Sequence, residues 1–256
     1  MEDNKFPREI SLCLSGGAAK GAFHLGVISV LQAHNIKIKA VSGTSIGALI
    51  GASLASGNSA DDILEMLKSK EFKSIFKFHF TKASIYKIDM QNTFIKKLVN
   101  KSTFEELDIP FELAMTNIDS AEVIYKNSGD RLHEYILASC AIAPIIGAVE
   151  IDRALYVDGG ITDNFPVESL KKYPYKILGI NLYPFIPERP DSILQWIKKI
   201  VFIAWQKPNL SKQNLCDFYI SSNSLIDINM FSFKDIDKAY RLGRKEMEKF
   251  LSQELL

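Results

Sequence analysis

The sequence predicts an α/β fold with a mostly parallel central sheet. Apolar, strand-like segments alternate with helix-like segments along all 256 residues, a pattern typical of domains in which helices connect parallel strands. Tyr175–Leu182 is apolar almost without interruption, as a parallel strand buried on both faces should be. No linker rich in Pro and Gly and no internal repeat divides the chain. We therefore expect a single doubly wound domain over residues 1–256.

Composition excludes several classes of protein. The net charge of +1 offers no basic field for nucleic acid. The cysteines Cys13, Cys140 and Cys216 are odd in number and lie in apolar runs, which indicates free thiols in a reducing compartment. Met1–Glu9 lacks the apolar core of a secretion signal, and no run of about 18 apolar residues predicts a membrane span. We expect a cytoplasmic protein, with attachment to a membrane surface and the oligomeric state left open.

Metal and cofactor sites are not expected either. The four histidines are scattered along the chain, and no acidic loop has the ligand spacing of a calcium site.

Each predicted strand is a short apolar run bounded by polar or turn residues. These runs are Ile10–Leu14, Ile36–Ser42, Phe111–Asn117, Glu122–Tyr125, Tyr175–Leu182 and Asp217–Ser221. In addition, Glu150–Val157 resembles a β-hairpin whose second arm ends at Asp158.

The predicted helices follow from apolar spacing and from end signals. One face of the first helix holds apolar residues at i, i+4, i+7 and i+8, namely Phe23, Val27, Val30 and Leu31. Ser102–Glu105 has the form of a capping box for a short helical turn, and Pro144 should end the helix before it. Further helices are expected at Ala48–Ala55, Ser59–Lys68, Met90–Val99, Leu132–Ala143, Asp191–Trp205 and Asp235–Leu251.

The loop at residues 15–21, Ser-Gly-Gly-Ala-Ala-Lys-Gly, lies between the first strand and the first helix. Small residues at a helix N-terminus expose successive amides that can hold an anion. A nucleotide site fits poorly, because Ala18 stands at the third loop position, where a dinucleotide fingerprint requires glycine, and the order Lys20-Gly21 is reversed relative to a phosphate loop. We therefore interpret the amides of Gly16, Gly17 and Ala18 as an oxyanion hole.

The second strand leads into Gly43-Thr44-Ser45-Ile46-Gly47, and an apolar helix follows. This Gly-x-Ser-x-Gly turn between strand and helix is typical of a nucleophile elbow, in which flanking glycines allow a strained, close-packed turn. The alternative is a tight turn without chemistry. We predict that Ser45 is a nucleophile.

A serine nucleophile needs a base. His24, His34, His79 and His133 all lie in the first half of the chain, so an order of Ser, acid and then His is disfavoured. A carboxylate can replace histidine. Asp158 ends an apolar strand and precedes Gly159 and Gly160, which lets its carboxylate approach another backbone segment; a plain turn is the alternative, and Asp163 is the nearest rival.

Lys70–Lys87 interleaves five aromatic residues with five lysines. Aromatics among lysines suit a lipid headgroup interface or a lid over an apolar site. An ordinary loop whose aromatics pack on the core is equally compatible with the pattern, and a peripheral membrane contact through this segment stays a hypothesis.

Taken together, the motifs at 15–21, 43–47 and 158–160 resemble, in order and spacing, those of the patatin-like phospholipase family, especially its bacterial members. The resemblance covers about residues 10–182; residues 183–256 match loosely and would complete the domain. It implies a three-layer α/β/α fold and a Ser–Asp dyad without histidine. Carried over, Ser45 is the nucleophile, Asp158 the base, and Gly16, Gly17 and Ala18 the oxyanion hole.

The remaining motif glycines carried over with these residues are Gly21, Gly43, Gly47, Gly159 and Gly160. Two departures from the family pattern matter. Ala18 stands where the family commonly has glycine, and residues 143–148, Ala-Pro-Ile-Ile-Gly-Ala, replace the usual Pro-Gly and aromatic run beside the site.

The predicted function is therefore that of a serine acyl hydrolase acting on acyl esters of (phospho)lipids, with no cofactor. Two alternatives are a lipid- or acyl-binding regulator with a weak site, and an esterase of soluble small acyl esters.

Overall fold

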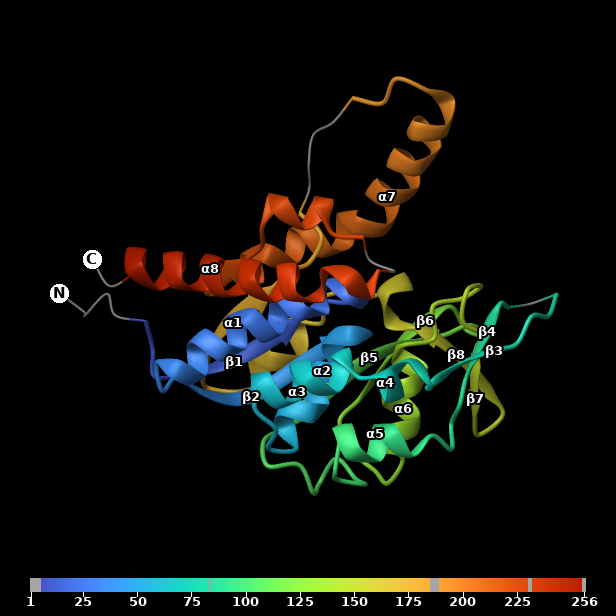
Figure 1. The fold of residues 1–256 in the computed structure, drawn as a ribbon, viewed down its shortest axis with the longest axis horizontal. Coiled ribbons are helices and arrows are strands. Elements are labelled where there is room, and N and C mark those ends of the chain that lie inside the picture. The colour runs from blue at the N-terminus through green and yellow to red at the C-terminus, as the bar shows by residue number, and fades with distance from the viewer. Residues whose placement is uncertain (1–5, 83, 185–188, 230–231, 255–256) are drawn as a thin grey trace.

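The computed structural model describes residues 6–82, 84–184, 189–229 and 232–254. Its centre is an eight-stranded sheet flanked by helices (Figure 1). The strands of this sheet are β1 (Glu9–Leu14), β2 (Lys37–Thr44), β5 (Phe111–Asn117), β6 (Glu122–Lys126), β7 (Val149–Ile151), β8 (Ala154–Asp158), β9 (Lys176–Ile180) and β10 (Phe218–Ile220). A separate two-stranded sheet pairs β3 (Phe76–Phe78) with β4 (Tyr86–Ile88).

The sheet order is β10-β9-β1-β2-β5-β8-β7, and β6 also pairs with β5. The strands β10, β9, β1, β2 and β5 are all parallel, whereas β6 and β8 run antiparallel to β5 and β7 runs antiparallel to β8. The predicted α/β class with a mostly parallel sheet is confirmed, with an antiparallel region at one end.

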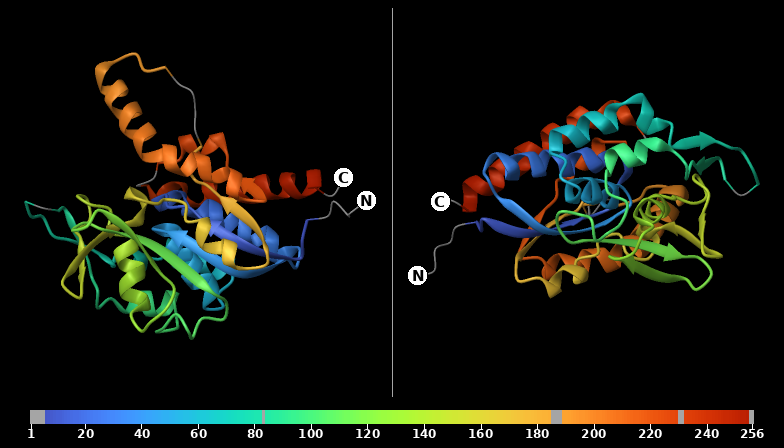
Figure 2. Two further views of the ribbon diagram at one scale, coloured as in Figure 1. Left: turned by 180° about the vertical axis from the view of Figure 1, so that it is seen from behind. Right: turned by 90° about the horizontal axis from the view of Figure 1, so that it is seen from below.

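The helices are α1 (Ala22–Ala33), α2 (Ile46–Ala55), α3 (Ala60–Lys68), α4 (Lys70–Lys73), α5 (Thr93–Leu98), α6 (Leu132–Ser139), α7 (Ile193–Ser211) and α8 (Ile236–Glu254). Figure 2 shows helices on both sides of the sheet, with α1 and α8 together on one side. Side chains alternate across a strand, so β1 contributes to two cores. Ile10, Leu12 and Leu14 join the large core with α1, and Cys13 joins a small core on the other face with Phe165.

Several predicted boundaries were wrong. The helix expected at Met90–Val99 begins only at Thr93, and the one expected to reach Ala143 ends at Ser139. The helix expected at Asp191–Trp205 continues to Ser211. The capping box expected at Ser102–Glu105 is shifted by one residue and forms a turn without a helix: the Thr103 hydroxyl accepts the Glu106 amide, and the Glu106 carboxylate accepts the Ser102 and Thr103 amides.

The segment Lys70–Lys87 packs on the core only in part, and its predicted membrane contact stays a prediction. Phe72 is buried in the core, whereas the arms and tip of the β3–β4 hairpin expose Phe78 and Phe80; Ala83 lies outside the described residues. Over the described ranges, no helix has both the length and the hydropathy needed to cross a bilayer.

Candidate active site

Ser45 is held in a strained conformation between β2 and α2. Its φ and ψ are 55° and −125°, a region that costs a residue with a side chain on the order of 1–3 kcal/mol. Only glycine fits at the positions two residues before and two residues after Ser45. A Cβ on Gly43 would lie 2.4 Å from the Gly47 carbonyl oxygen, and one on Gly47 would lie 2.3 Å from the Leu14 carbonyl oxygen. The predicted strand, tight turn and helix are confirmed.

The last residue of α6 supports this turn. The Ser45 amide donates to the Ser139 hydroxyl at 2.9 Å, and that hydroxyl donates to the Ala114 carbonyl on β5 at 2.7 Å. Both serines are buried. The strained backbone is therefore connected through hydrogen bonds to the centre of the sheet.

Sheet register brings the elbow and Asp158 together. Residues 113–117 of β5 pair with β6 along one edge, so β2 and β8 must share the other edge. Along that edge Thr44 is opposite Ala114 and Asp158 is opposite Met115. Because β2 is parallel and β8 antiparallel to β5, the two strands meet end to end. Residues 113 positions apart in the sequence thus become neighbours.

Asp158 is 7% exposed. Its Oδ1 accepts the Gly160 amide at 2.7 Å, and its buried Oδ2 has no hydrogen-bond partner among the described residues. Burial raises the pKa of Asp158 to about 6, while the nearby Ser45 hydroxyl and the Gly160 amide oppose this shift. Gly159 allows the close approach, because a Cβ there would lie 2.3 Å from the Ala114 carbonyl oxygen.

Two residues of the Gly-rich loop lie at the same site. Gly17 and Ala18 line a cavity with Ser45, and their N–H groups donate to no group in the described part of the chain. Ala18 has a φ of 48°, so the methyl group that replaces the family's glycine sits on a residue in the left-handed region, at a cost of about 1 kcal/mol.

The Gly16 amide is engaged elsewhere. It donates to the Asn164 carbonyl at 3.2 Å, so this structure does not fit the prediction that Gly16 supplies an oxyanion donor. A Cβ on Gly21 would lie 2.3 Å from Ile46 Cγ1, and this glycine therefore lets the loop pack against the start of α2.

The histidines have structural contacts. Buried His24 donates from Nε2 to the Ser15 carbonyl at 2.8 Å, and burial lowers its pKa to about 4. A ring nitrogen of His133 bonds to the Val99 carbonyl at 2.8 Å. Among the described residues that line the cavity, none is a histidine.

The cavity has a volume of about 230 Å³. It is lined by Gly17, Ala18, Ser45, Ile142, Ala143, Asp158, Ile161, Asn164, Tyr183 and Trp205. Most of this lining is apolar. Ile142 directly precedes, and Ala143 begins, the segment 143–148 in which the sequence departs from the family pattern.

Sequence reasoning missed the aromatic wall of the cavity. The rings of Tyr183 and Trp205 meet edge to face with centroids 4.9 Å apart, and the Trp205 indole N–H donates to the Gly160 carbonyl. Trp205 comes from α7, far from the three motifs. No local pattern distinguishes it from the other apolar residues of that helix.

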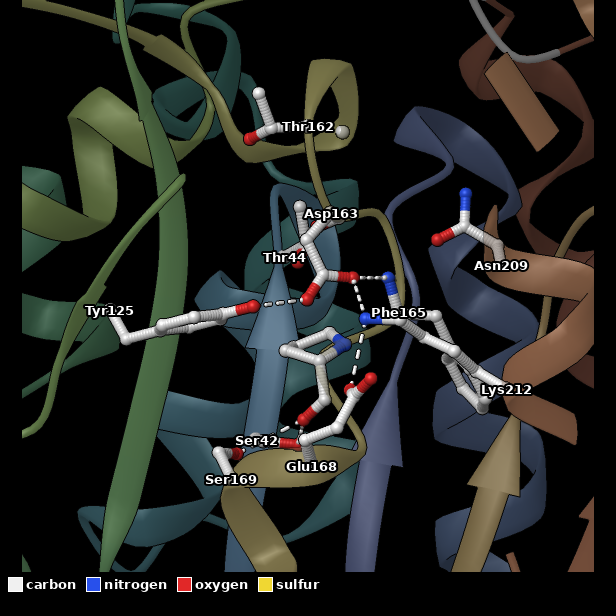
Figure 3. Close-up of polar contacts among 12 residues, drawn as sticks. Ser42, Thr44, Tyr125, Thr162, Asp163, Phe165, Glu168, Ser169, Asn209 and Lys212 are labelled. Atoms are coloured by element: carbon white, nitrogen blue, oxygen red, sulfur yellow. Dashed lines mark hydrogen bonds and ion pairs between the residues drawn. The ribbon is translucent and has the colours of Figure 1, made fainter. Parts of the chain in front are cut away.

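Asp163, the rival carboxylate, is fully paired outside the cavity lining (Figure 3). Its Oδ2 accepts the Tyr125 hydroxyl at 2.6 Å, and its Oδ1 accepts the Phe165 amide at 3.0 Å and Lys212 Nζ at 2.8 Å. Lys212 also pairs with Glu168 at 2.9 Å. These contacts fit a structural residue that fixes the loop after Asp158.

The model of the patatin-like phospholipase family matches residues 12–171. The chain belongs to this family. The matched range contains the Gly-rich loop, the serine elbow and Asp158, but neither α7 nor α8.

Relatives of this patatin-like chain include an NTE family protein of Mycobacterium tuberculosis, 26% identical over 201 residues that cover 75% of this chain and 55% of that protein. The lysophospholipase nte1 of Emericella nidulans is 33% identical over 172 residues, which cover 64% of this chain and 11% of that protein. The chain therefore matches about half of the first relative and a small part of the second.

Solved structures show the same fold. VipD from Legionella pneumophila superposes with a TM-score of 0.58 at 15% identity, over 98% of this chain and 68% of that chain. The type III effector protein ExoU has a TM-score of 0.50 at 15% identity, over 98% of this chain and 54% of that chain. The predicted patatin-like α/β architecture is confirmed.

Proposed function

We propose that this patatin-like domain is a serine acyl hydrolase that cleaves acyl esters of lipids through Ser45 and Asp158. The strongest support for this proposal is the arrangement of groups around one cavity. A strained serine and a buried carboxylate share a cavity with two loop residues whose amides have no partner in the described part of the chain, and no described residue of the lining is a histidine. A nucleophile, a base and oxyanion donors in one apolar site are the parts that acyl transfer requires.

In this mechanism Asp158 Oδ2 takes the proton of the Ser45 hydroxyl while Oγ attacks the ester carbonyl carbon. The amides of Gly17 and Ala18 hold the developing oxyanion. Asp158 then gives the proton to the leaving alcohol, and an acyl-serine ester remains. Water loses a proton to the same carboxylate, attacks this ester and releases the fatty acid, and the proton returns to Ser45.

A lipid substrate is favoured by the apolar lining and by the family. The nte1 relative is named a lysophospholipase, and a lysophospholipid or phospholipid ester fits the same chemistry. We include the β3–β4 hairpin as a peripheral lipid contact. Its exposed Phe78 and Phe80 lie in a segment bonded to the chain just after the cavity-lining Ala143, since the amides of Ile85 and Tyr86 both donate to the Ile145 carbonyl.

Replacing the nucleophile is the decisive experiment. We expect Ser45→Ala to lower kcat/KM for a short acyl ester by roughly 10⁴–10⁶ and to abolish labelling by a fluorophosphonate probe. Ser42→Ala is the matched control, because Ser42 is also a buried β2 serine but donates its hydroxyl to the Pro166 carbonyl at 2.8 Å. Equal activity of the Ser45 variant and wild type would reject the proposal, and an unlabelled wild type would favour a regulator.

The pH profile tests the base. Asp158 must be ionised to accept the proton, and its raised pKa is about 6. We therefore expect kcat/KM for a soluble ester to be level above pH 7 and to fall below pH 6, reaching about one tenth of its plateau near pH 5. Steady-state kinetics in buffers of constant ionic strength measure this. A profile that stays level down to pH 4 would argue against Asp158.

A further inference from the structure

The helix α7 exposes an unusual amount of apolar surface. The most exposed of its large apolar residues are Ile193 (81%), Leu194 (61%), Trp196 (53%), Ile197 (55%), Ile200 (58%) and Val201 (62%). Scattered exposed apolar residues are ordinary, whereas a contiguous group of them marks an interaction surface. Figure 1 shows this part of the helix extending away from the body of the molecule.

The opposite side of α7 packs against the rest of the protein. Phe202 and Trp205 both pack edge-on or tilted against Tyr183, with centroids 6.4 and 4.9 Å from its ring. Gln206 and Asn209 are buried one turn further along. With 3.6 residues per turn, these positions lie on the helix face opposite Ile193, Ile197 and Ile200. One helix therefore presents a wall to the cavity and an apolar face to the solvent.

The cavity is too small to enclose a whole long-chain lipid. About 230 Å³ is below the roughly 300–1,000 Å³ of sites that enclose a drug-sized ligand. The site can hold an ester and a short part of an acyl chain, and the rest of a long-chain lipid must lie outside. Trp205 lines the cavity, and the exposed apolar face lies on the other side of the same helix.

We propose that α7 docks on a lipid bilayer, with its exposed apolar face in the interfacial region. This inference rests on the proposed function. The occupant is a bilayer because the helix that carries this face also lines the site for an acyl ester through Trp205, and because the nineteen residues of α7 contain no Asp or Glu and include lysines at three positions. Such composition suits an interfacial helix on a membrane with anionic lipids. A second copy of the chain is the competing occupant.

Trp196 offers a direct probe of insertion. The chain has two tryptophans, so Trp205→Phe leaves Trp196 as the only one. We expect vesicles of phosphatidylcholine and phosphatidylglycerol to shift its emission to the blue, and lipids brominated on the acyl chain to quench it. Unchanged emission while the protein sediments with vesicles would overturn the proposal, because another surface would then make the contact.

Charges on the exposed face should weaken this binding. We expect the double variant Ile197→Asp/Val201→Asp to lose at least about tenfold in vesicle affinity and in turnover of vesicle phospholipid, and to hydrolyse a soluble short acyl ester within about twofold of wild type. Ile226→Asp is the matched control: Ile226 is 51% exposed but lies outside α7, and we expect it to bind vesicles like wild type.

Two results would overturn the inference. One is wild-type turnover of vesicles by the double variant. The other is a wild type that does not bind vesicles but self-associates in analytical ultracentrifugation, with self-association lost in the double variant. Failure of the proposed function has a different signature, since Ser45→Ala would then keep its activity toward the soluble ester whatever α7 does.

Discussion

The helices α7 and α8 have the same length but opposite relations to the rest of the molecule. Each has nineteen residues, and both lie beyond the range that the family model matches. The more polar helix, α8, buries Ala239, Met247 and Leu251 almost completely, whereas the more apolar α7 exposes most of its large side chains. Burial follows the arrangement of apolar residues around a helix, and their number is a poor guide.

Contact between two backbones explains how α8 is held. A Cβ on Gly243 would lie 2.1 Å from the Phe23 carbonyl oxygen, and one on Gly26 would lie 2.1 Å from the Tyr240 carbonyl oxygen. Because Gly26 and Gly243 have no side chains, α1 and α8 can approach closely. Arg244 adds a hydrogen bond to the Ser29 hydroxyl at 3.0 Å. This face contributes to stability, whereas the exposed face of α7 does not.

Filling the α1–α8 contact should give the largest loss of stability. We expect Gly243→Val to lower the free energy of unfolding by about 4 kcal/mol, since the new side chain meets backbone that cannot move aside. Denaturant unfolding measures the loss. The control Lys245→Val places the same residue on the exposed side of α8 and should cost no more than about 0.7 kcal/mol. Equal losses would show that the two backbones are not in close contact.

The anchor at the C-terminal end of α7 should be the next most sensitive. Lys212 follows α7 directly and its side chain is 14% exposed, in a pair with Asp163 at 3%. We expect Lys212→Met to cost about 2–3 kcal/mol, because it leaves a buried carboxylate with only its neutral partners. Thermal and denaturant unfolding measure this against Lys171→Met, which removes an exposed lysine. A loss below about 0.5 kcal/mol would mean that this pair does not hold the helix.

The exposed face of α7 should be nearly neutral for folding. We expect Ile197→Asp/Val201→Asp to change the free energy of unfolding by less than about 0.5 kcal/mol, because both side chains are already in water. Circular dichroism during urea unfolding measures this. A loss of several kcal/mol would show that the face is packed in solution and would remove the contrast with α8.

Local patterns were sufficient for the fold class and for the serine elbow. The alternation of strands and helices predicted the mostly parallel sheet, and Gly43 and Gly47 predicted the tight turn, because these features depend on residues next to one another in the chain. The predicted ends of helices were less accurate where tertiary contacts decide them. The helix α7 runs beyond Trp205 to Ser211, where the next residue, Lys212, pairs with Asp163, far away in the sequence.

The sequence by itself determined a strand, a strained serine turn and a helix, together with a Gly-rich loop and an aspartate followed by two glycines. Only the tertiary structure decided that β2 and β8 meet end to end on β5, which places Asp158 beside Ser45. It also engaged the Gly16 amide with Asn164 and brought Trp205 into the cavity. The physical reason is register. Strand pairing and helix docking join residues far apart in the chain, and no local pattern encodes which of them will meet.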